Sequence, residues 1–565
     1  MDTMRNNRSQ QRVTQRCKLQ LRPVAACMLL GFGAAPVFAD IEIIPSLQTA
    51  SHGYEVERAN DGKDRGFAQN VTPGLIVRYQ ASWLQSSLSV DHDAILYRDE
   101  QRDNSSYSSY RFDNRANFWR DQLQLQMSAA SSHQASGGLF SRYADEITGG
   151  DQLAKFDSKN ASLNFNNTKL DWLNTRFSLS ANESATDLVN DPLRPENGLT
   201  DIDLANRRFG TDLNLGSARR NSKIFWDLGL TAYKTDREVA QDFYNRSGNA
   251  TLGVTVFSGL ALIGRGAYES NGDIGAERFA GFRDFKSFGG GFEWRFSERS
   301  WWNLTLNKID NQQGESDYIG SEFSFQPSRR TRLTGTLDRR FFGRTAQVVG
   351  SYNLKHFNMQ ANFSDSVDSL LGFNNNGPQF GLFLCPPGAI PSLENCIQPP
   401  SANYQPQPGE QFFVVPLPPG NLNESLVVRR NGSYTFGYNF NRLKLQLQLG
   451  ARRDLYLERD AETRDNYVTA SANWTLSQRN SVTLTSSLSD VEFINNDASN
   501  NDGSGNNLGF GQQEGTQSST ELSFVRNLNR QLTGTLAAKT IKADFQDDRN
   551  DYRENRLSLR FEFKF

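Results

Sequence analysis

The last nine residues of the chain alternate strictly between apolar and polar side chains. From Leu557 to Phe565, every odd position holds Leu or Phe, and every even position holds Ser, Arg, Glu or Lys. A period of two gives a β-strand one apolar and one polar face. The pattern recurs along the chain, for instance from Leu443 to Leu449, where leucines alternate with Lys and Gln. It therefore predicts an all-β protein built from amphipathic strands.

The apolar faces of these strands are expected to contact lipid. Only 37% of the residues are hydrophobic, and beyond the amino-terminal region no run of about 18 apolar residues offers a helical membrane span. The chain nevertheless holds 39 Phe, 17 Tyr and 45 Gly, which suits a barrel whose inner wall faces water. We expect a large antiparallel transmembrane β-barrel in the outer membrane of a Gram-negative bacterium, surrounded by outer-membrane lipid and lipopolysaccharide.

The aromatic residues of the last strand have a second expected role. Phe561, Phe563 and Phe565 place an aromatic side chain at every other position up to the end of the chain. This arrangement is typical of the strand that closes an outer-membrane barrel, and it resembles the signal read by the barrel-assembly machinery. We therefore predict that machinery as a partner of the chain.

Residues 1–39 are typical of a secretory signal peptide. Basic residues precede an apolar run from Pro23 to Ala35, and small residues stand where cleavage requires them. The run is too short for a transmembrane helix. We predict cleavage between Ala39 and Asp40, which leaves residues 40–565 as a single barrel domain.

The charge balance argues against nucleic-acid binding. The chain carries 61 Lys and Arg against 63 Asp and Glu, and removal of the signal peptide takes away mainly basic residues. The mature chain is therefore acidic, whereas nucleic-acid binders are usually basic.

Motifs that carry chemistry are sparse. Gly289–Gly291 lies inside a strand pattern, where it predicts a bend or a close approach rather than a phosphate site. No nucleophile elbow or Ser–His–Asp grouping stands out, although a triad can assemble in space from distant residues. We predict no enzymatic role, no cofactor and no metal site.

The connections between predicted strands alternate between short and long. Short ones fall, for example, near residues 80–84 and 476–480, and longer polar ones near 52–69, 134–154 and 494–517. Outer-membrane barrels are built with short inner turns and long outer loops, and counting the segments gives about 24 strands, in a range of roughly 22–26. An even number places both chain ends on the periplasmic side.

The positions of the tryptophans support this sidedness. All lie within a few residues of a predicted short connection, whereas indole prefers the membrane–water interface. We therefore predict an aromatic girdle at the periplasmic rim. Its members are Trp83, Trp119, Trp172, Trp226, Trp294, Trp301, Trp302 and Trp474.

The longest connection, residues 366–425, holds most of the 18 prolines and both cysteines of the mature chain. Cys385 and Cys396 lie close together in the sequence of an exported protein, which predicts a disulfide. The connection also contains the apolar stretch Phe412–Leu417, which is unfavourable to expose to water. We expect it to fold over or into the lumen as a plug, although a floppy external loop also fits the sequence.

Three short segments are similar to those of a known family. Asn70–Val77 contains Thr-Pro-Gly just after the first predicted outer loop, Phe325–Leu333 contains Pro-Ser-x-x-Thr, and Asp338–Gly343 contains an Arg-Phe-Phe-Gly turn. Together they resemble the outer-membrane proteins associated with the PEP-CTERM/exopolysaccharide system. Phe325 and Gln326 replace the usual Trp of that family, and the cysteine-bearing loop has no counterpart in it.

This resemblance implies a role in the export or assembly of a surface exopolysaccharide. It also implies two further partners, a periplasmic polysaccharide-export protein and the polymer itself. The residues that face the lumen are neutral amides mixed with both charge signs, which suit a hydroxyl-rich polymer and a general diffusion pore equally. Two alternatives therefore remain, a porin or small-solute channel and a structural sleeve around an electron-transfer partner.

Overall fold

The computed structural model describes residues 40–58, 62–98, 102–119, 122–135, 146–148, 153–167, 170, 172–188, 204–217, 223–237, 242–272, 284–297, 299–310, 316–369, 380–385, 411–416, 426–457, 460–495, 513–546 and 551–565. The predicted signal peptide, including Ala39, lies outside these residues. Asp40 is the first residue of the first strand.

Almost every described residue belongs to a strand or to a turn between strands. The strands are β1 (Asp40–Arg58), β2 (Gly62–Gln80), β3 (Leu84–Tyr97), β4 (Ser105–Phe118), β5 (Leu123–Ala135), β6 (Leu153–Asn167), β7 (Leu173–Leu188), β8 (Leu204–Ser217), β9 (Ile224–Arg237), β10 (Phe243–Phe257), β11 (Leu260–Asn271), β12 (Asp284–Ser297), β13 (Ser300–Asp310), β14 (Ser316–Ser328), β15 (Thr331–Arg340), β16 (Gly343–Asn353), β17 (Phe357–Ser369), β18 (Phe380–Cys385), β19 (Gln411–Pro416), β20 (Leu426–Asn439), β21 (Leu443–Tyr456), β22 (Ala461–Ser477), β23 (Asn480–Asn495), β24 (Gln513–Asn527), β25 (Leu532–Phe545) and β26 (Tyr552–Lys564). In this part of the chain no helix is long and apolar enough to cross a membrane.

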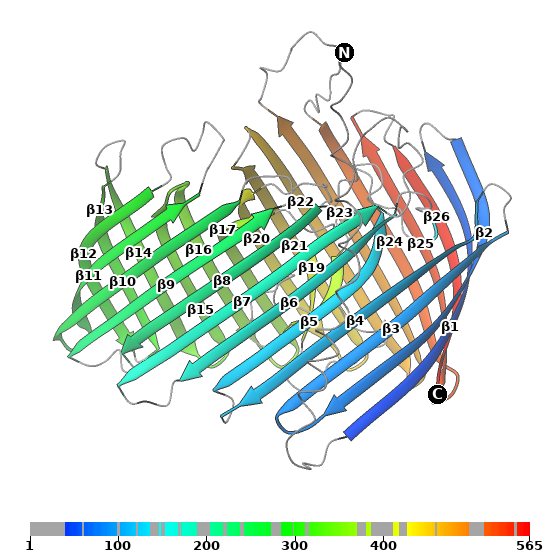
Figure 1. The fold of residues 1–565 in the computed structure, drawn as a ribbon, viewed down its shortest axis with the longest axis horizontal. Helices are drawn as coiled ribbons and strands as arrows, with labels where there is room; N and C mark the ends of the chain where they lie inside the picture. Colours follow the sequence, from blue (N-terminus) through cyan, green and yellow to red (C-terminus); the bar gives the residue numbers. More distant parts are fainter. Residues whose placement is uncertain are drawn as a thin grey trace, which may run out of the picture.

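The described strands form a closed ring (Figure 1). A 24-stranded antiparallel sheet closes on itself because β1 pairs with both β2 and β26, while β18 and β19 form a separate two-stranded sheet. This confirms the predicted all-β fold and the predicted strand number.

The last strand closes the barrel, as its aromatic pattern predicts. Phe563 lies opposite Leu47 of β1, and on the other edge Phe561 lies opposite Gly534 of β25. Strand β26 is therefore paired along both edges, which leaves it no open edge to attract another chain.

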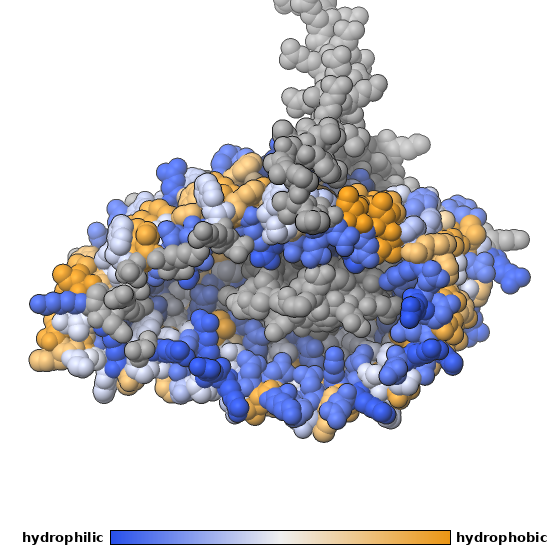
Figure 2. Space-filling model, turned by 90° about the horizontal axis from the view of Figure 1, so that it is seen from below, coloured by the Kyte–Doolittle hydropathy of each residue, from blue (hydrophilic) through white to orange (hydrophobic). Residues whose placement is uncertain are grey.

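Alternate residues of each strand face the membrane or the lumen. On β26, Leu557 and Leu559 are exposed on the outer surface, whereas Glu554 and Arg556 are buried on the inner surface. Figure 2 looks into the barrel from below and shows hydrophilic residues around the hollow, with many apolar residues along the outer margin. A closed barrel with an apolar outer band is the form in which strands cross an outer membrane. The protein is an outer-membrane β-barrel.

The predicted first outer loop is wrong. The sequence predicts a loop over residues 52–69, but β1 continues to Arg58 and β2 begins at Gly62. The outward side chains of this part of β1 include Glu55 and Glu57, so the strand continues past its apolar band. The apolar residues Tyr54 and Val56 face inward instead, so the alternation is inverted and this part of the strand has no apolar outer face.

The longest connection agrees with its predicted position. Strand β17 ends at Ser369 and β20 begins at Leu426, and these two strands are paired directly with each other. Between them the structure describes the hairpin of β18 and β19, in which Leu384 lies opposite Phe412. The predicted role of this connection as a plug stays a prediction.

Candidate functional site: a segment held against the lumen wall

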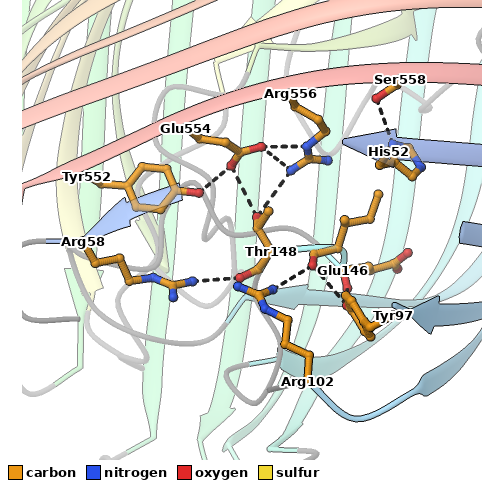
Figure 3. A network of polar contacts seen from close by, with 11 residues as sticks. His52, Arg58, Tyr97, Arg102, Glu146, Thr148, Tyr552, Glu554, Arg556 and Ser558 are labelled. Carbon is orange, nitrogen blue, oxygen red and sulfur yellow. Dashed lines mark hydrogen bonds and ion pairs between the residues drawn. The ribbon is translucent and has the colours of Figure 1, made fainter. Parts of the chain in front are cut away.

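A short segment of the connection between β5 and β6 lies inside the barrel. Residues Glu146 to Thr148 contact lumen-facing side chains of β1, β3 and β26, at the seam where the first and last strands meet (Figure 3). We call these three residues the pinned segment. Ile147 is 7% exposed and Thr148 is 1% exposed, so the segment is packed against the wall.

The backbone carbonyl groups of the pinned segment are held from three sides. Arg58 of β1 donates to the Thr148 oxygen over 2.8 Å. The Tyr97 hydroxyl of β3 lies 3.1 Å from the Glu146 oxygen and 3.0 Å from the Ile147 oxygen. Arg102, in the connection after β3, donates to the Ile147 oxygen over 3.0 Å. These contacts recognise the backbone, so they fix the position of the segment rather than its side-chain chemistry.

The Thr148 side chain joins the segment to a buried ion pair on β26. Its hydroxyl donates to a Glu554 oxygen over 3.3 Å and accepts from Arg556 over 3.3 Å. Glu554 also accepts from Arg556, with Nε at 2.7 Å, and from the Tyr552 hydroxyl. Glu554 is fully buried. A buried carboxylate is tolerated only when it is paired and hydrogen-bonded in this way.

Ile147 anchors the segment by burial of apolar surface. It belongs to a cluster of buried residues on the inner wall that includes Tyr54 and Val56 of β1, Ile95 of β3 and Ile541 of β25. Fully burying an Ile side chain stabilises by roughly 1.5–3 kcal/mol. The pinned segment is therefore attached by an apolar side chain in its centre and by hydrogen bonds on both sides.

Arg102 is held in its charged form. Its guanidinium donates to Asp64 over 2.5 Å and lies over the Tyr54 ring, 5.1 Å from the centroid. Burial opposes the charge, but Tyr54 and the Asp64 carboxylate outweigh it and raise the pKa of the Arg102 guanidinium. The hydrogen bond from Arg102 to the Ile147 oxygen is therefore retained over physiological pH.

Several independent contacts attach the pinned segment. Hydrogen bonds to charged groups such as Arg58, Arg102 and Glu554 contribute about 1.5–3 kcal/mol each, so together with the buried Ile147 they fix the segment to the wall. Among the described residues, no group of three or more His, Cys, Asp or Glu could hold a metal ion.

A second set of contacts crosses the lumen at the opposite side of the sheet, between the green strands of Figure 1. Arg265 of β11 pairs with Asp338 of β15, and Arg340 of β15 pairs with Glu269 of β11 over 2.5 Å. Strands β12, β13 and β14 lie between β11 and β15 in the sheet. The sheet therefore bends sharply here, so that side chains of non-neighbouring strands meet.

Glycines allow this bend. A Cβ at Gly291 of β12 would lie 1.8 Å from the carbonyl oxygen of Leu304, and one at Gly320 of β14 would lie 3.0 Å from the Arg265 guanidinium. The close approach predicted for Gly289–Gly291 is confirmed.

One of the three segments that carry the family resemblance, Asp338–Gly343, takes part in these contacts. Asp338 and Arg340 form the ion pairs to β11, and Phe341, in the following turn, is 3% exposed. In a second of these segments, Asn70–Val77, Thr72 donates to Asp93 over 2.5 Å on the inner face of β2. Its Thr-Pro-Gly lies in the middle of β2, and not at the start of a strand.

Of the predicted assembly residues, Phe561 and Phe563 belong to β26 and Phe565 directly follows it. Phe561 and Phe565 are exposed, and the rings of Phe563 and Phe565 pack edge to face with centroids 4.5 Å apart. Cys385 is the last residue of β18. Cys396 lies outside the described residues, so the disulfide stays a prediction.

The tryptophans lie at the short-turn end of the barrel. One of them, Trp301, does not face the membrane. Trp119, Trp172 and Trp474 are more than half exposed. On β13, Trp302 is exposed on the outer surface, so the adjacent Trp301 points to the lumen because successive strand residues face opposite sides. The inclusion of Trp301 in a membrane-facing ring is wrong.

Sequence reasoning missed the pinned segment entirely. Glu146, Ile147 and Thr148 carry no pattern that separates them from the rest of a long polar connection. Glu554 and Arg556 have a weak signal, since they continue the even, lumen-facing positions of the terminal strand. Their outward neighbours Arg553 and Asn555 are polar too, and this hides the alternation.

No protein-family model matches the chain, and no curated protein sequence matches it. Among solved structures, the chain is similar to the siderophore receptor PirA from Acinetobacter baumannii, with 10% identity, a TM-score of 0.43, and coverage of 94% of this chain and 81% of that one. It is also similar to the FrpB iron transporter from Neisseria meningitidis, with 8% identity, a TM-score of 0.42, and coverage of 92% and 81%. For OccK2 from Pseudomonas aeruginosa, crystallised with glucuronate, the identity is 11%, the TM-score 0.33, and the coverage 93% and 98%. Since these values are low, the function has to be inferred from the residues of this chain.

Proposed function

We propose that this outer-membrane barrel takes part in the export or assembly of a surface exopolysaccharide, and that the pinned segment restricts its lumen until the polymer engages. A periplasmic polysaccharide-export protein and the polymer are the partners in this proposal. The observation that carries it is the attachment of Glu146–Thr148 to the seam through Arg58, Tyr97, Arg102 and Glu554.

Such an attachment supports a regulated barrel. A barrel of about 24 strands is wider than the 16–18-stranded ones that leave an aqueous channel, and 22-stranded ones hold a plug. A lumen of that width would leak small solutes unless something inside it were fixed. The pinned segment supplies a fixed internal element. On the other side of the barrel, the ion pairs of Asp338 and Arg340 connect β15 to β11.

A general diffusion porin is the second candidate. The hydrophilic residues around the hollow in Figure 2 favour it, because a porin needs only a wide, polar lumen. A sleeve around an electron-transfer partner fits less well, since a sleeve needs an unobstructed lumen and the pinned segment lies within it.

The proposal is tested by deleting the gene and by releasing the segment. Deletion is expected to lower surface polysaccharide while uptake of small solutes stays unchanged. The double variant Ile147→Ser with Thr148→Val removes the apolar anchor and the contact with Glu554, so its single-channel conductance in planar bilayers should rise severalfold over the low value of the intact protein.

Ser558→Ala is the matched control for the released segment. It removes the 2.8 Å contact between Ser558 and His52 at the same seam without touching the pinned segment, so its conductance should equal that of the intact protein. If the intact protein conducts freely and its deletion leaves surface polysaccharide unchanged, the porin takes the place of the export proposal.

A further inference from the structure

An open groove of about 610 Å³ lies on the wall formed by β17 and β20 to β24. Gly432 and Ala451 line it with little or no side chain, which leaves a hollow between larger apolar neighbours. These neighbours are Phe363, Tyr434, Leu449, Val468 and Leu488. We call this hollow the outer groove.

The outer groove faces the membrane and not the lumen. Phe363, Leu449 and Val468 are 39%, 41% and 41% exposed. Gly432 lies directly opposite both Phe363 and Ala451, and residues directly opposite each other share one face of a sheet. On β21 this face continues the alternating leucines, while Lys and Gln lie on the other face. The outer groove is therefore an apolar hollow at the boundary with lipid.

Three arginines stand beside the groove on the same face. Arg430, Arg453 and Arg464 each lie two residues from a lining residue of the groove, on β20, β21 and β22. Arg453 is directly opposite both Arg430 and Arg464. We call these residues the arginine row. Like charges directly opposite each other in a sheet are unfavourable, so the row needs anions.

Carboxylates of the chain meet this need only in part. The six charges of the row and its partners sum to zero, but the carboxylate side chains are 4–26% exposed, whereas the arginine side chains are 33–45% exposed. A ligand that approaches from the membrane therefore meets mainly guanidinium groups. The pairs are Arg430 with Asp365 at 3.6 Å, Arg453 with Glu462 at 2.6 Å, and Arg464 with Glu492 at 3.2 Å.

The row lies nearer than the groove to the long connection between β17 and β20, because residue numbers on β20 fall toward that connection. Outer-membrane barrels place long connections outside, so the groove lies in the outer leaflet. The lipid of that leaflet is lipopolysaccharide, whose lipid A part carries acyl chains and phosphate groups. An apolar groove below a row of cations complements both parts of this molecule.

We infer that the outer groove binds an acyl chain of lipid A and that the arginine row binds its phosphate. Two residues of a strand span about 7 Å, so the phosphate site lies directly above the groove. Guanidinium groups bind phosphate oxygens with two parallel hydrogen bonds. On β23 the outward face becomes acidic, with Asp490 and Glu492, which places the phosphate over β20 to β22. The site is on the outer surface, so it does not depend on what passes through the lumen.

The test is binding of bisphosphorylated lipid A to the full mature barrel in detergent, measured by native mass spectrometry. Arg453→Gln with Arg464→Gln removes two cations of the row and should weaken binding by about tenfold or more. The matched control, Arg207→Gln with Arg553→Gln, removes two outward arginines from other parts of the wall. It should bind lipid A like the unmodified protein.

A second variant tests the groove without changing any charge. Ala451→Phe fills the hollow between the apolar side chains and should weaken lipid A binding severalfold. Ala181→Phe, on β7 next to the outward Leu179 in the sheet face, is its control and should have no effect. Only protein that gives the folded, fast-migrating gel band is compared, so that loss of folding is not read as loss of binding.

Unchanged binding by the arginine variant and by Ala451→Phe, or no binding of lipid A to the unmodified barrel, would overturn the site. An effect of only one of these variants would refute the other half of it. Equal binding of dephosphorylated lipid A would overturn the role of the arginine row. Equal binding of phosphatidylglycerol would show that the site takes phospholipids in general and would overturn the assignment to lipid A.

Discussion

At the scale of single residues, the lumen wall and the outer rim use charge differently. Glu554 is fully buried and is bound by Tyr552, Thr148 and Arg556. At the rim, by contrast, Arg65 pairs with Glu55 while its side chain is 72% exposed. Breaking a buried pair leaves an uncompensated charge in a medium that solvates it poorly, whereas an exposed pair exchanges its partner for water. The two pairs are therefore expected to respond differently to the same substitution.

We predict that Glu554→Gln destabilises the barrel by roughly 3 kcal/mol, because Arg556 keeps its charge and loses its carboxylate. The measurement is the temperature at which the folded, fast-migrating gel band disappears. The same change in the exposed pair, Glu55→Gln, should cost less than about 1 kcal/mol. Equal shifts for the two variants would show that burial of Glu554 does not matter.

At the scale of elements, strands pair aromatic rings with glycines directly across the ladder. Phe225 of β9 lies opposite Gly253 of β10, and Phe545 of β25 lies opposite Gly515 of β24. A Cβ at Gly253 would lie 2.0 Å from the Phe225 ring, and one at Gly515 would lie 2.2 Å from the Phe545 ring. Each glycine thus receives the ring of its partner, and the pair fills the wall without widening the ladder.

We predict that Gly253→Ala destabilises the barrel by about 1–3 kcal/mol, because the added methyl group displaces the Phe225 ring. Gly264 on the neighbouring β11 is the matched control, since a Cβ there meets nothing within 4 Å. Gly264→Ala should leave stability unchanged or raise it slightly. Both are measured by urea unfolding in lipid vesicles, and a neutral Gly253→Ala would contradict the packing seen here.

Sequence patterns predict the strands whose outer face meets lipid, and fail where the outer face is polar. The alternation of Leu557–Phe565 identifies the closing strand, and its aromatic residues lie on the outer surface as predicted. Residues 52–58 and 552–556 are strands as well, but their outward side chains are polar, so they lack the apolar outer face that identifies the other strands. The pinned segment is held by long-range contacts with Arg58, Tyr97 and Glu554, and no local pattern encodes such contacts.

At the scale of the whole molecule, the strand order shows which connections lie at which end of the barrel. Strand β23 runs from Asn480, directly after a two-residue turn, to Asn495, before the long connection to β24. The two connections therefore lie at opposite ends. Asp40 and Phe565 share the end with the short turns, as shown by the backbone hydrogen bond from Phe565 to Pro45 near the start of β1.

We predict that an epitope tag in the 496–512 connection is reached by antibody on intact cells, whereas a tag at Gln478–Arg479 is reached only after the outer membrane is permeabilised. The reason is that outer-membrane barrels place long loops outside and short turns in the periplasm. The reverse labelling would show that the barrel lies in the membrane in the opposite orientation to the one predicted.

Closure of the lumen is the property of the whole molecule that decides between export and free diffusion. Two parts of the chain are candidates for it, the pinned segment and the long connection between β17 and β20. We predict that excision of Leu384 to Pro419 raises single-channel conductance and sensitivity to bulky antibiotics, and that combining it with Ile147→Ser and Thr148→Val raises both further. Strands β17 and β20 pair directly from Phe357 with Tyr438 to Ser369 with Leu426, so the excision spares the ladder and the folded gel band should persist.

The combined variant separates the two closures because each acts on a different part of the wall. The pinned segment is attached at β1, β3 and β26, whereas the excised connection leaves the wall between β17 and β20. If the connection alone closes the lumen, excision gives full conductance and releasing the segment adds nothing. If the segment alone closes it, excision has no effect until the segment is released. High conductance of the intact protein would exclude both, and would leave a barrel that is open at rest.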